Sequence, residues 1–186
     1  RWNEMQNTYE QEDNGDAVAE LMRYCGQSIL SDYTKLSTGA YTTDVAIALT
    51  KYFDYDKNLE LKYLEHHDIS EWETIIYNEI KAGRPVHHSG YSLGGGHAFV
   101  CDGYDGNGMF HFNWGWGGSH DGYYKLSLMN PGTGGIGSGS SDGYSYGQQI
   151  IIGIQPPTGE KAKTKPFLPN SEQIANHALY SYFLNP

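Results

Sequence analysis

The hydrophobic pattern of this 186-residue chain changes its period near residue 85, and that change constrains the fold more than any other feature. Before it, apolar residues recur at spacings of three and four, which is typical of amphipathic helices. After it, apolar and polar residues alternate, which is typical of half-buried strands. Helices that come first and are then followed by strands predict an α+β domain with an antiparallel sheet.

Three helices are predicted before this change and five strands after it. Gly26 is interpreted as the glycine that ends the first helix, and residues 32–42 are expected to form a loop. Asp-Gly-Asn-Gly at residues 105–108 predicts a tight hairpin turn between two strands. The helices are expected over residues 16–25, 44–53 and 70–82, and the strands over 85–91, 97–104, 108–114, 122–128 and 148–154.

Composition narrows the classes of partner. The formal net charge is −10 and the pI is about 5.1, so the chain lacks the basic surface that nucleic acids and anionic membranes bind. No apolar run approaches the ~20 residues of a membrane-spanning helix. The 16 tyrosines and 24 glycines fit a β-rich domain with many loops.

Two neighbouring motifs point to a family. They are Gly-Gly-His-Ala-Phe-Val at residues 95–100 and Asn-Trp-Gly-Trp-Gly-Gly at residues 113–118. Together they resemble the histidine-bearing half of the streptopain family, which are secreted bacterial cysteine peptidases of the papain-like type. The resemblance extends from about Trp2 to Ile154. It implies a papain-like α+β fold and a cysteine endopeptidase that acts through a thioester acyl-enzyme.

The chemistry of such a peptidase assigns roles to three residues. A thiolate is the nucleophile, so an imidazole must take the proton of the thiol and later protonate the leaving amine. His97 is expected to be this general base. Its far nitrogen needs an acceptor that fixes the ring, and Asn113 is expected to supply it, with Trp114 shielding the contact from water.

The resemblance also implies residues that contact the substrate. Glycines beside the histidine allow a peptide backbone to approach closely. The expected contacts are Gly95 and Gly96 on one wall of a cleft, Ser37 and Gly39 on the other, and Trp116 with the 131–147 loop framing the primed side.

The nucleophilic cysteine is expected upstream of Arg1 or on a separate chain, so the part of the fold with the nucleophile helix would be absent from this sequence. Cys25 is predicted to be a buried helical residue. Cys101 follows His97 by four residues on one strand, which separates them by about 13 Å. Both cysteines are therefore expected to be structural.

Two pairs of adjacent histidines, His66–His67 and His87–His88, raise the question of a metal site. Adjacent residues on a strand face opposite sides, and no cysteine or carboxylate set at ligand spacing completes either pair. No metal and no cofactor are expected.

The leading hypothesis makes residues 1–155 the C-terminal portion of a papain-like peptidase domain and residues 156–186 a Pro- and Lys-containing linker or docking tail. The expected partners are a peptide or protein substrate, the upstream segment with the catalytic cysteine, and an inhibitory N-terminal propeptide. The zymogen would be secreted, or held at the cell surface or in the periplasm, of a bacterium.

Two other functions are compatible with the sequence. The first is a non-catalytic streptopain-like homologue that acts as a peptide-binding, protein-binding or inhibitory module. The second is a carbohydrate-binding β-domain that uses its tyrosines and tryptophans. A positioned imidazole argues against the first, and the predicted helices argue against the second.

Overall fold

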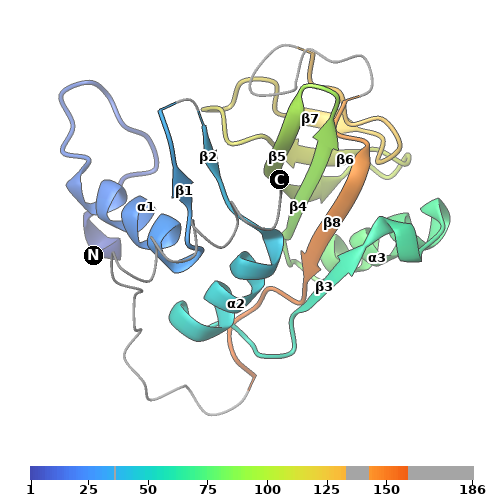
Figure 1. Ribbon diagram of the computed structural model, residues 1–186, viewed down its shortest axis with the longest axis horizontal. Helices are drawn as coiled ribbons and strands as arrows, with labels where there is room; N and C mark the ends of the chain where they lie inside the picture. The colour runs from blue at the N-terminus through green and yellow to red at the C-terminus, as the bar shows by residue number, and fades with distance from the viewer. Residues whose placement is uncertain (36, 133–142, 159–186) are drawn as a thin grey trace. The chain divides into compact units, whose positions relative to one another are not determined.

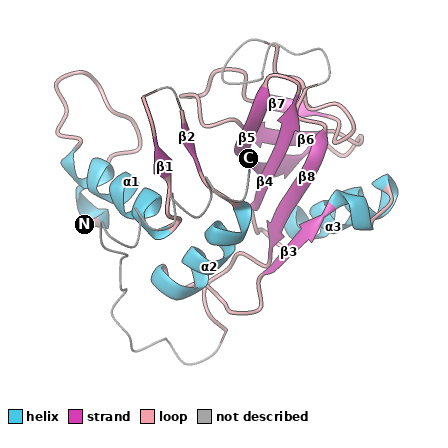
Figure 2. Ribbon diagram, in the orientation of Figure 1, coloured by secondary structure: helices cyan, strands magenta, loops and turns pink. Residues whose placement is uncertain are grey.

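The computed structural model describes residues 1–35, 37–132 and 143–158. They fall into two compact units, Arg1–Asp54 and a second that begins at Tyr55 (Figure 1). Each unit combines helices with strands (Figure 2). None of the described helices has the length and apolar character that crossing a bilayer requires.

The first unit contains the first two predicted helices and a short hairpin. The hairpin lies within residues 32–42, where only a loop was expected. Its two strands have two residues each, too short for an alternating pattern to show in the sequence. The elements are the 3-10 helix η1 (Trp2–Glu4), α1 (Asp16–Ser28), β1 (Asp32–Tyr33), β2 (Thr38–Gly39) and α2 (Thr42–Tyr52).

Gly26 does not end α1, contrary to expectation. The helix continues to Ser28, and Gly26 is buried within it. A Cβ atom on Gly26 would lie 1.7 Å from the hydroxyl oxygen of Tyr33. A larger side chain at this position would have to displace the Tyr33 ring, a tertiary contact that no local capping pattern reveals.

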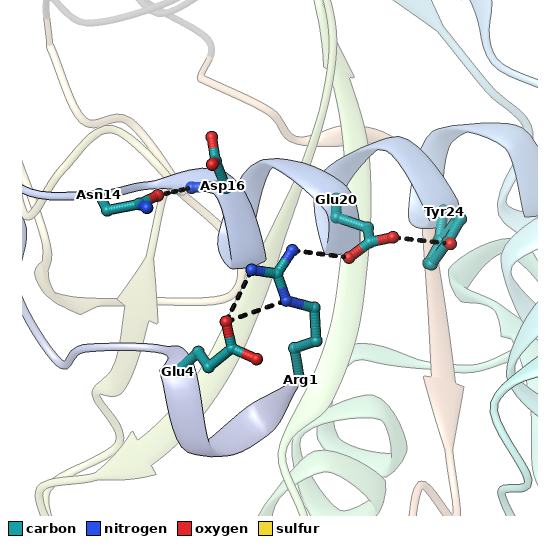
Figure 3. Close-up of polar contacts among 6 residues, drawn as sticks. All are labelled: Arg1, Glu4, Asn14, Asp16, Glu20 and Tyr24. Carbon is teal, nitrogen blue, oxygen red and sulfur yellow. Dashed lines mark hydrogen bonds and ion pairs between the residues drawn. The ribbon is translucent and has the colours of Figure 1, made fainter.

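A polar network joins η1 to α1 (Figure 3). The Arg1 guanidinium donates to Glu4 Oε2 at 2.6 and 3.0 Å and to Glu20 Oε2 at 3.3 Å. Glu20 Oε1 accepts from the Tyr24 hydroxyl at 2.9 Å. The Arg1 contact lowers the pKa of Glu4, and the hydrogen bonds from Tyr24 and Arg1 lower the pKa of Glu20. Because the side chains are solvent-accessible, the network orients η1 more than it stabilises the fold.

The start of α1 has its own hydrogen bond, also drawn in Figure 3. The backbone N–H of Asp16 donates to Asn14 Oδ1 at 2.9 Å. This bond satisfies one of the donors that every helix leaves open in its first turn.

The second unit is built on a six-stranded antiparallel sheet of order β3-β8-β4-β5-β6-β7. The last of the described strands, β8, inserts between β3 and β4 (Figure 1). The elements are β3 (Glu60–Tyr63), the 3-10 helix η2 (Leu64–His66), α3 (Ile69–Lys81), β4 (Val86–Ser92), β5 (Gly95–Tyr104), β6 (Phe110–Asn113), β7 (Gly122–Tyr124) and β8 (Tyr146–Ile152).

All five predicted strands and the third predicted helix are present, but β3 was not predicted. Its four residues, Glu-Leu-Lys-Tyr, have little β-branched character and begin with a charge. The strand exists because its backbone pairs with β8, with Glu60 opposite Ile152. A partner so distant in sequence is not visible in a local pattern.

The hydrophobic core lies between α3 and one face of the sheet. Alternate residues of the central strands face α3, as the period of two predicts, and Trp72 and Ile76 of α3 are fully buried against them. The core strand residues are Val86, Phe99, Cys101, Phe110, Phe112 and Ile150, and the connecting segments add Trp114, Leu126, Met129 and Tyr144.

A buried ion pair attaches the end of α3 to the end of β8. Arg84 donates to both carboxylate oxygens of Glu79, at 2.6 and 2.7 Å. Glu79 Oε2 also accepts from the backbone N–H of Gly153 at 2.8 Å. Glu79 is only 6% exposed, and its pKa is lowered, chiefly by the bonds from Arg84.

Replacing Glu79 with glutamine is expected to lower the free energy of unfolding by about 2 kcal/mol, because charge-assisted bonds are lost and Arg84 loses its counter-ion. Urea unfolding at neutral pH measures this. The control is Glu65→Gln, whose side chain is 76% exposed and which should leave the stability nearly unchanged. Equal effects of the two substitutions would contradict the structural role of the pair.

The segment after β8 is fastened to the start of the second unit. Thr158 donates to Asp56 Oδ2 from its backbone nitrogen at 2.9 Å and from its hydroxyl at 2.5 Å. These bonds lower the pKa of Asp56. The boundary between residues 155 and 156 stays a prediction, and residues 159–186 of the expected tail lie outside the described residues.

Candidate active site

His97 lies near the beginning of β5, on the face that carries Phe99 and Cys101 into the core. Its backbone is opposite Gly90 of β4. The side chain is half-buried, and this burial lowers the pKa of His97, while a hydrogen bond with the Trp114 backbone acts in the opposite direction. The imidazole is therefore neutral at neutral pH and able to accept a proton.

The acceptor for the His97 ring is a backbone carbonyl. His97 Nε2 lies 2.8 Å from the carbonyl oxygen of Trp114, so Nε2 carries the hydrogen and donates it. The expected acceptor was the side chain of Asn113. In the sheet Asn113 is opposite Val100, three residues past His97, and its side chain is exposed. The register therefore brings the residue after Asn113 to the ring.

Asn113 acts on the same peptide from its other side. Asn113 Oδ1 accepts from the backbone N–H of Gly115 at 2.9 Å. This N–H and the carbonyl of Trp114 are the two ends of one peptide unit. The side chain of Asn113 therefore contacts the peptide unit whose carbonyl meets His97. It was expected to contact the imidazole directly.

Aromatic rings enclose the imidazole. The nearest is Trp116, whose ring centroid lies 4.8 Å from that of His97 at an interplanar angle of 23°. Trp114 is fully buried and lies 6.4 Å away at 17°, and Tyr144 lies 5.4 Å away at 40°. Trp116 is thus the ring closest to the imidazole, and the shielding role expected of Trp114 stays a prediction.

The second ring nitrogen of His97, Nδ1, has no hydrogen-bond partner within the described parts of the chain. Because Nε2 holds the proton that faces Trp114, Nδ1 carries the lone pair. This is the arrangement that a general base needs: one nitrogen anchored and the other able to take a proton.

The two glycines before His97 differ in their surroundings. Gly95 has a φ of 141°, which favours glycine. A Cβ on Gly96 would lie 2.7 Å from the ring of Tyr91 on β4, so a larger residue there would have to displace that ring. The expected role of both as one wall of a substrate cleft stays a prediction.

Ser37 and Gly39 belong to the hairpin of the first unit. The carbonyl of Ser37 accepts from the Thr34 backbone at 3.0 Å and from its hydroxyl at 2.6 Å, which closes the turn. Gly39 pairs with Asp32, and both predicted residues are exposed. Their contact with a substrate stays a prediction. Most of the 131–147 loop, residues 133–142, lies outside the described residues.

Neither cysteine has the properties of a nucleophile. Cys101 is fully buried in the core, and this burial raises its pKa to about 12. Cys25 is exposed, contrary to the expectation of a buried residue, because Ala17, Gly26 and Ser28 form the buried face of α1. Partial burial of the thiol still raises the pKa of Cys25. Thiolate chemistry requires the opposite shift.

One contributor to the site was not predicted. Asp121 Oδ1 accepts from the backbone N–H of Trp114 at 2.9 Å. In sequence, an aspartate before Gly122 is typical of a turn that leads into a strand, and nothing local links it to a histidine 24 residues earlier, His97. Among the described residues, no three histidine, cysteine or carboxylate side chains are grouped so that they could hold a metal ion.

Comparison with known proteins is consistent with this geometry. Residues 1–124 match the model of the Peptidase C10 family. The chain is 40% identical over 144 residues to the thiol protease/hemagglutinin PrtT of Porphyromonas gingivalis. The aligned region covers 77% of this chain and 16% of that protein. It is 38% identical over 161 residues to Streptopain of Streptococcus pyogenes, and that aligned region covers 83% of this chain and 39% of that protein.

Solved structures give the same result for the fold. The active wild-type interpain A cysteine protease of Prevotella intermedia matches with a TM-score of 0.73 and 34% identity, over 82% of this chain and 63% of that one. A prointerpain A fragment from the same organism matches with a TM-score of 0.67 and 33% identity, over 82% and 47%. The expected papain-like α+β fold is confirmed, and the chain spans less than two-thirds of each of these relatives.

Proposed function

Because this chain belongs to the Peptidase C10 family, as its streptopain-like motifs predicted, we propose that it is the histidine-bearing part of a cysteine endopeptidase. One observation carries the proposal. His97 is anchored through Nε2 to the Trp114 carbonyl at 2.8 Å, enclosed by aromatic rings, and has Nδ1 available to take a proton. Unlike the fully buried core histidine His88, His97 is only half-buried, so its ring is not sealed inside the core.

The proposed reaction begins with proton transfer from a cysteine thiol to Nδ1 of His97. The thiolate sulfur attacks the carbonyl carbon of the scissile peptide, and the tetrahedral intermediate collapses to a thioester as the C–N bond breaks. The imidazolium gives its proton to the departing amine. Water then attacks the thioester while His97 takes a proton from it, and the thiol is restored as the acid product leaves.

The Trp114 carbonyl contributes throughout this cycle. It accepts from Nε2–H while the ring is neutral, and the same bond becomes charge-assisted when Nδ1 is protonated. The carbonyl therefore favours the imidazolium that stands beside the thiolate. Asn113 is proposed to hold this carbonyl in place through Gly115, and Trp116 to exclude water from the contact.

The nucleophile is proposed to come from a segment outside these residues, as part of the same protein or as a separate chain. The raised thiol pKa values of Cys25 and Cys101 support this. Gly95 and Gly96 in the second unit, and Ser37 and Gly39 in the first, are each proposed as residues that contact a peptide or protein substrate. The prointerpain relative supports an inhibitory N-terminal propeptide, and we propose that the protein is secreted from a bacterium as a zymogen.

A thiol-directed inhibitor tests the proposal. The protein is expected to hydrolyse a casein or peptide substrate, to lose this activity on reaction with an epoxysuccinyl inhibitor, and to carry one inhibitor per molecule. Peptide mapping by mass spectrometry should place the label on a cysteine other than Cys25 and Cys101. Absence of activity and of specific labelling, together with retained peptide binding, would instead support a non-catalytic binding module.

The variant Cys25→Ser is expected to keep peptide hydrolysis close to the wild-type rate, because the residue is exposed on α1 and its thiol pKa is raised rather than lowered. The measurement is kcat/KM for a fluorogenic peptide, with the inhibitor titration repeated on the variant. Loss of both activity and labelling would identify Cys25 as the nucleophile and overturn the proposed external cysteine.

A further inference from the structure

The carbonyl that anchors His97 lies in the glycine-rich connection between β6 and β7, where no atoms crowd the glycines. Between the end of β6 at Asn113 and the start of β7 at Gly122, the chain reads Trp-Gly-Trp-Gly-Gly-Ser-His-Asp. All three glycines of this segment have φ values of 62° to 84°, and a Cβ on any of them would meet no atom within 4 Å. Glycines leave such a segment more conformations than other residues would, so the burial of Trp114 and the hydrogen bonds of the turn together select the one observed.

Two side chains supply hydrogen bonds to consecutive peptide units of this turn. Asn113 Oδ1 accepts from Gly115 N–H, and Asp121 Oδ1 accepts from Trp114 N–H, each at 2.9 Å. Trp114 thus has its N–H fixed by Asp121, while its carbonyl is fixed by His97. Both hydrogen-bonding groups of the residue that contacts the imidazole are accounted for.

The position of Asp121 is itself secured by the sheet. It directly precedes Gly122, which is opposite Phe112 in the β6–β7 ladder. It is partly buried, and its backbone N–H donates to the carbonyl of Gly118 at 3.4 Å. A carboxylate next to a strand ladder is a rigid hydrogen-bond acceptor. The glycine-containing backbone between Trp114 and Asp121 is not rigid by itself.

From this arrangement we propose that Asp121 is a positioning residue, which orients His97 through the Trp114 peptide without touching the reacting atoms. The inference rests on the proposed role of His97 as general base. If the carboxylate is removed, the turn can rotate and the carbonyl of Trp114 leaves Nε2 for part of the time. His97 then loses its preference for the Nε2–H tautomer, and Nδ1 is no longer reliably free.

Three variants of the whole protein test this. Asp121→Ala removes the acceptor, and Asp121→Asn keeps an acceptor oxygen of the same shape without the charge. The matched control is Asp105→Ala in the β5–β6 turn, where Asp105 Oδ1 likewise accepts from backbone, at 2.7 Å from Asn107 N and 3.0 Å from Met109 N. Asp105 is eight residues beyond His97, just past the end of β5, about 26 Å away along the strand.

The first readout is the tautomer of His97, measured by nitrogen NMR of ring-labelled protein and assigned with a His97→Gln variant. The Nδ1–H tautomer should become roughly threefold or more populated in Asp121→Ala, since the net value of one hydrogen bond corresponds to a change of that size. It should return to near the wild-type level in Asp121→Asn and stay unchanged in Asp105→Ala. An unchanged tautomer in Asp121→Ala, an equal shift in Asp105→Ala, or no recovery in Asp121→Asn would overturn the inference.

The second readout is peptide hydrolysis. Asp121→Ala should lower kcat between about 10- and 100-fold with KM nearly unchanged, as expected when a catalytic group is misplaced. Asp121→Asn should recover most of the rate. The tautomer measurement does not need turnover, so an inactive wild-type protein with the predicted tautomer shifts would refute the peptidase proposal and leave the positioning role of Asp121 standing.

Discussion

Replacing His97 with glutamine is expected to lower kcat/KM for peptide hydrolysis by about 10³- to 10⁴-fold. Glutamine keeps an N–H that can donate to the Trp114 carbonyl, so the turn after β6 keeps its anchor. It has no group that can shuttle a proton at neutral pH. Activity should therefore fall while the thermal unfolding temperature stays close to that of the wild type.

The control for this substitution is His111→Gln. Like His97, His111 lies on a strand of the sheet and has a hydrogen-bond partner. Its Nδ1 lies 2.5 Å from Asp102 Oδ1 on β5. It makes no contact with the aromatic rings around His97, and its replacement should leave hydrolysis unchanged. A His97→Gln variant that retained more than a tenth of the wild-type rate would rule out His97 as the general base.

The second large effect is loss of stability in mild acid, caused by His88. This side chain is fully buried on β4, stacked on Phe99 at 5.1 Å and 21°. Its Nε2 lies 3.1 Å from Gln148 Oε1, and the Gln148 amide donates to the carbonyl of Leu126 at 3.1 Å, so Nε2 of His88 must carry the hydrogen. No partner for Nδ1 is present within the described residues, and a second proton would have no acceptor.

Burial lowers the pKa of His88 to about 3 from an ordinary value of 6.5. Above pH 6.5 neither the folded nor the unfolded chain binds a proton at this residue. Between pH 6.5 and about 3 only the unfolded chain does, so acid favours unfolding by about 1.4 kcal/mol for each pH unit. Burial lowers the pKa of His87 to about 4, which adds a similar dependence over a narrower range.

The variant His88→Gln isolates the contribution of His88. Glutamine can still donate to Gln148 but does not titrate, so the difference in unfolding free energy between wild type and variant should change by roughly 3 kcal/mol from pH 7 to pH 4.5. Urea unfolding at a series of pH values measures this difference. A difference for His88→Gln that stays constant with pH would show that the pKa of His88 is not lowered by folding.

Much of the fold could be predicted because its signals are local. The change from a period near 3.6 to a period of two separates the helices from the strands, and each periodic segment became the expected element. The elements that were missed are short. The strand β3 is held by a partner, β8, from the far end of the domain, and β1 and β2 have two residues each. Their existence depends on pairing rather than on composition.

The candidate site divides in the same way. Residue types and motifs in the sequence predicted His97 and the Asn-Trp pair, because a general base and its support require particular side chains. The identity of the acceptor could not be predicted. A shift in register between Cys101 and Gly103 places Asn113 opposite Val100, and the carbonyl of Trp114 takes the position at the ring.

What the sequence determined by itself, then, is the order of helices and strands, the family, and the candidate side chains for the proposed chemistry. Tertiary structure alone decided which atoms meet. A backbone carbonyl is present at every residue and leaves no trace in the sequence, so its use by His97 is visible only once the strands are paired. The same holds for Asp121, which reaches Trp114 because β7 returns alongside β6, and for Gly26, whose missing side chain leaves room for the Tyr33 ring against α1.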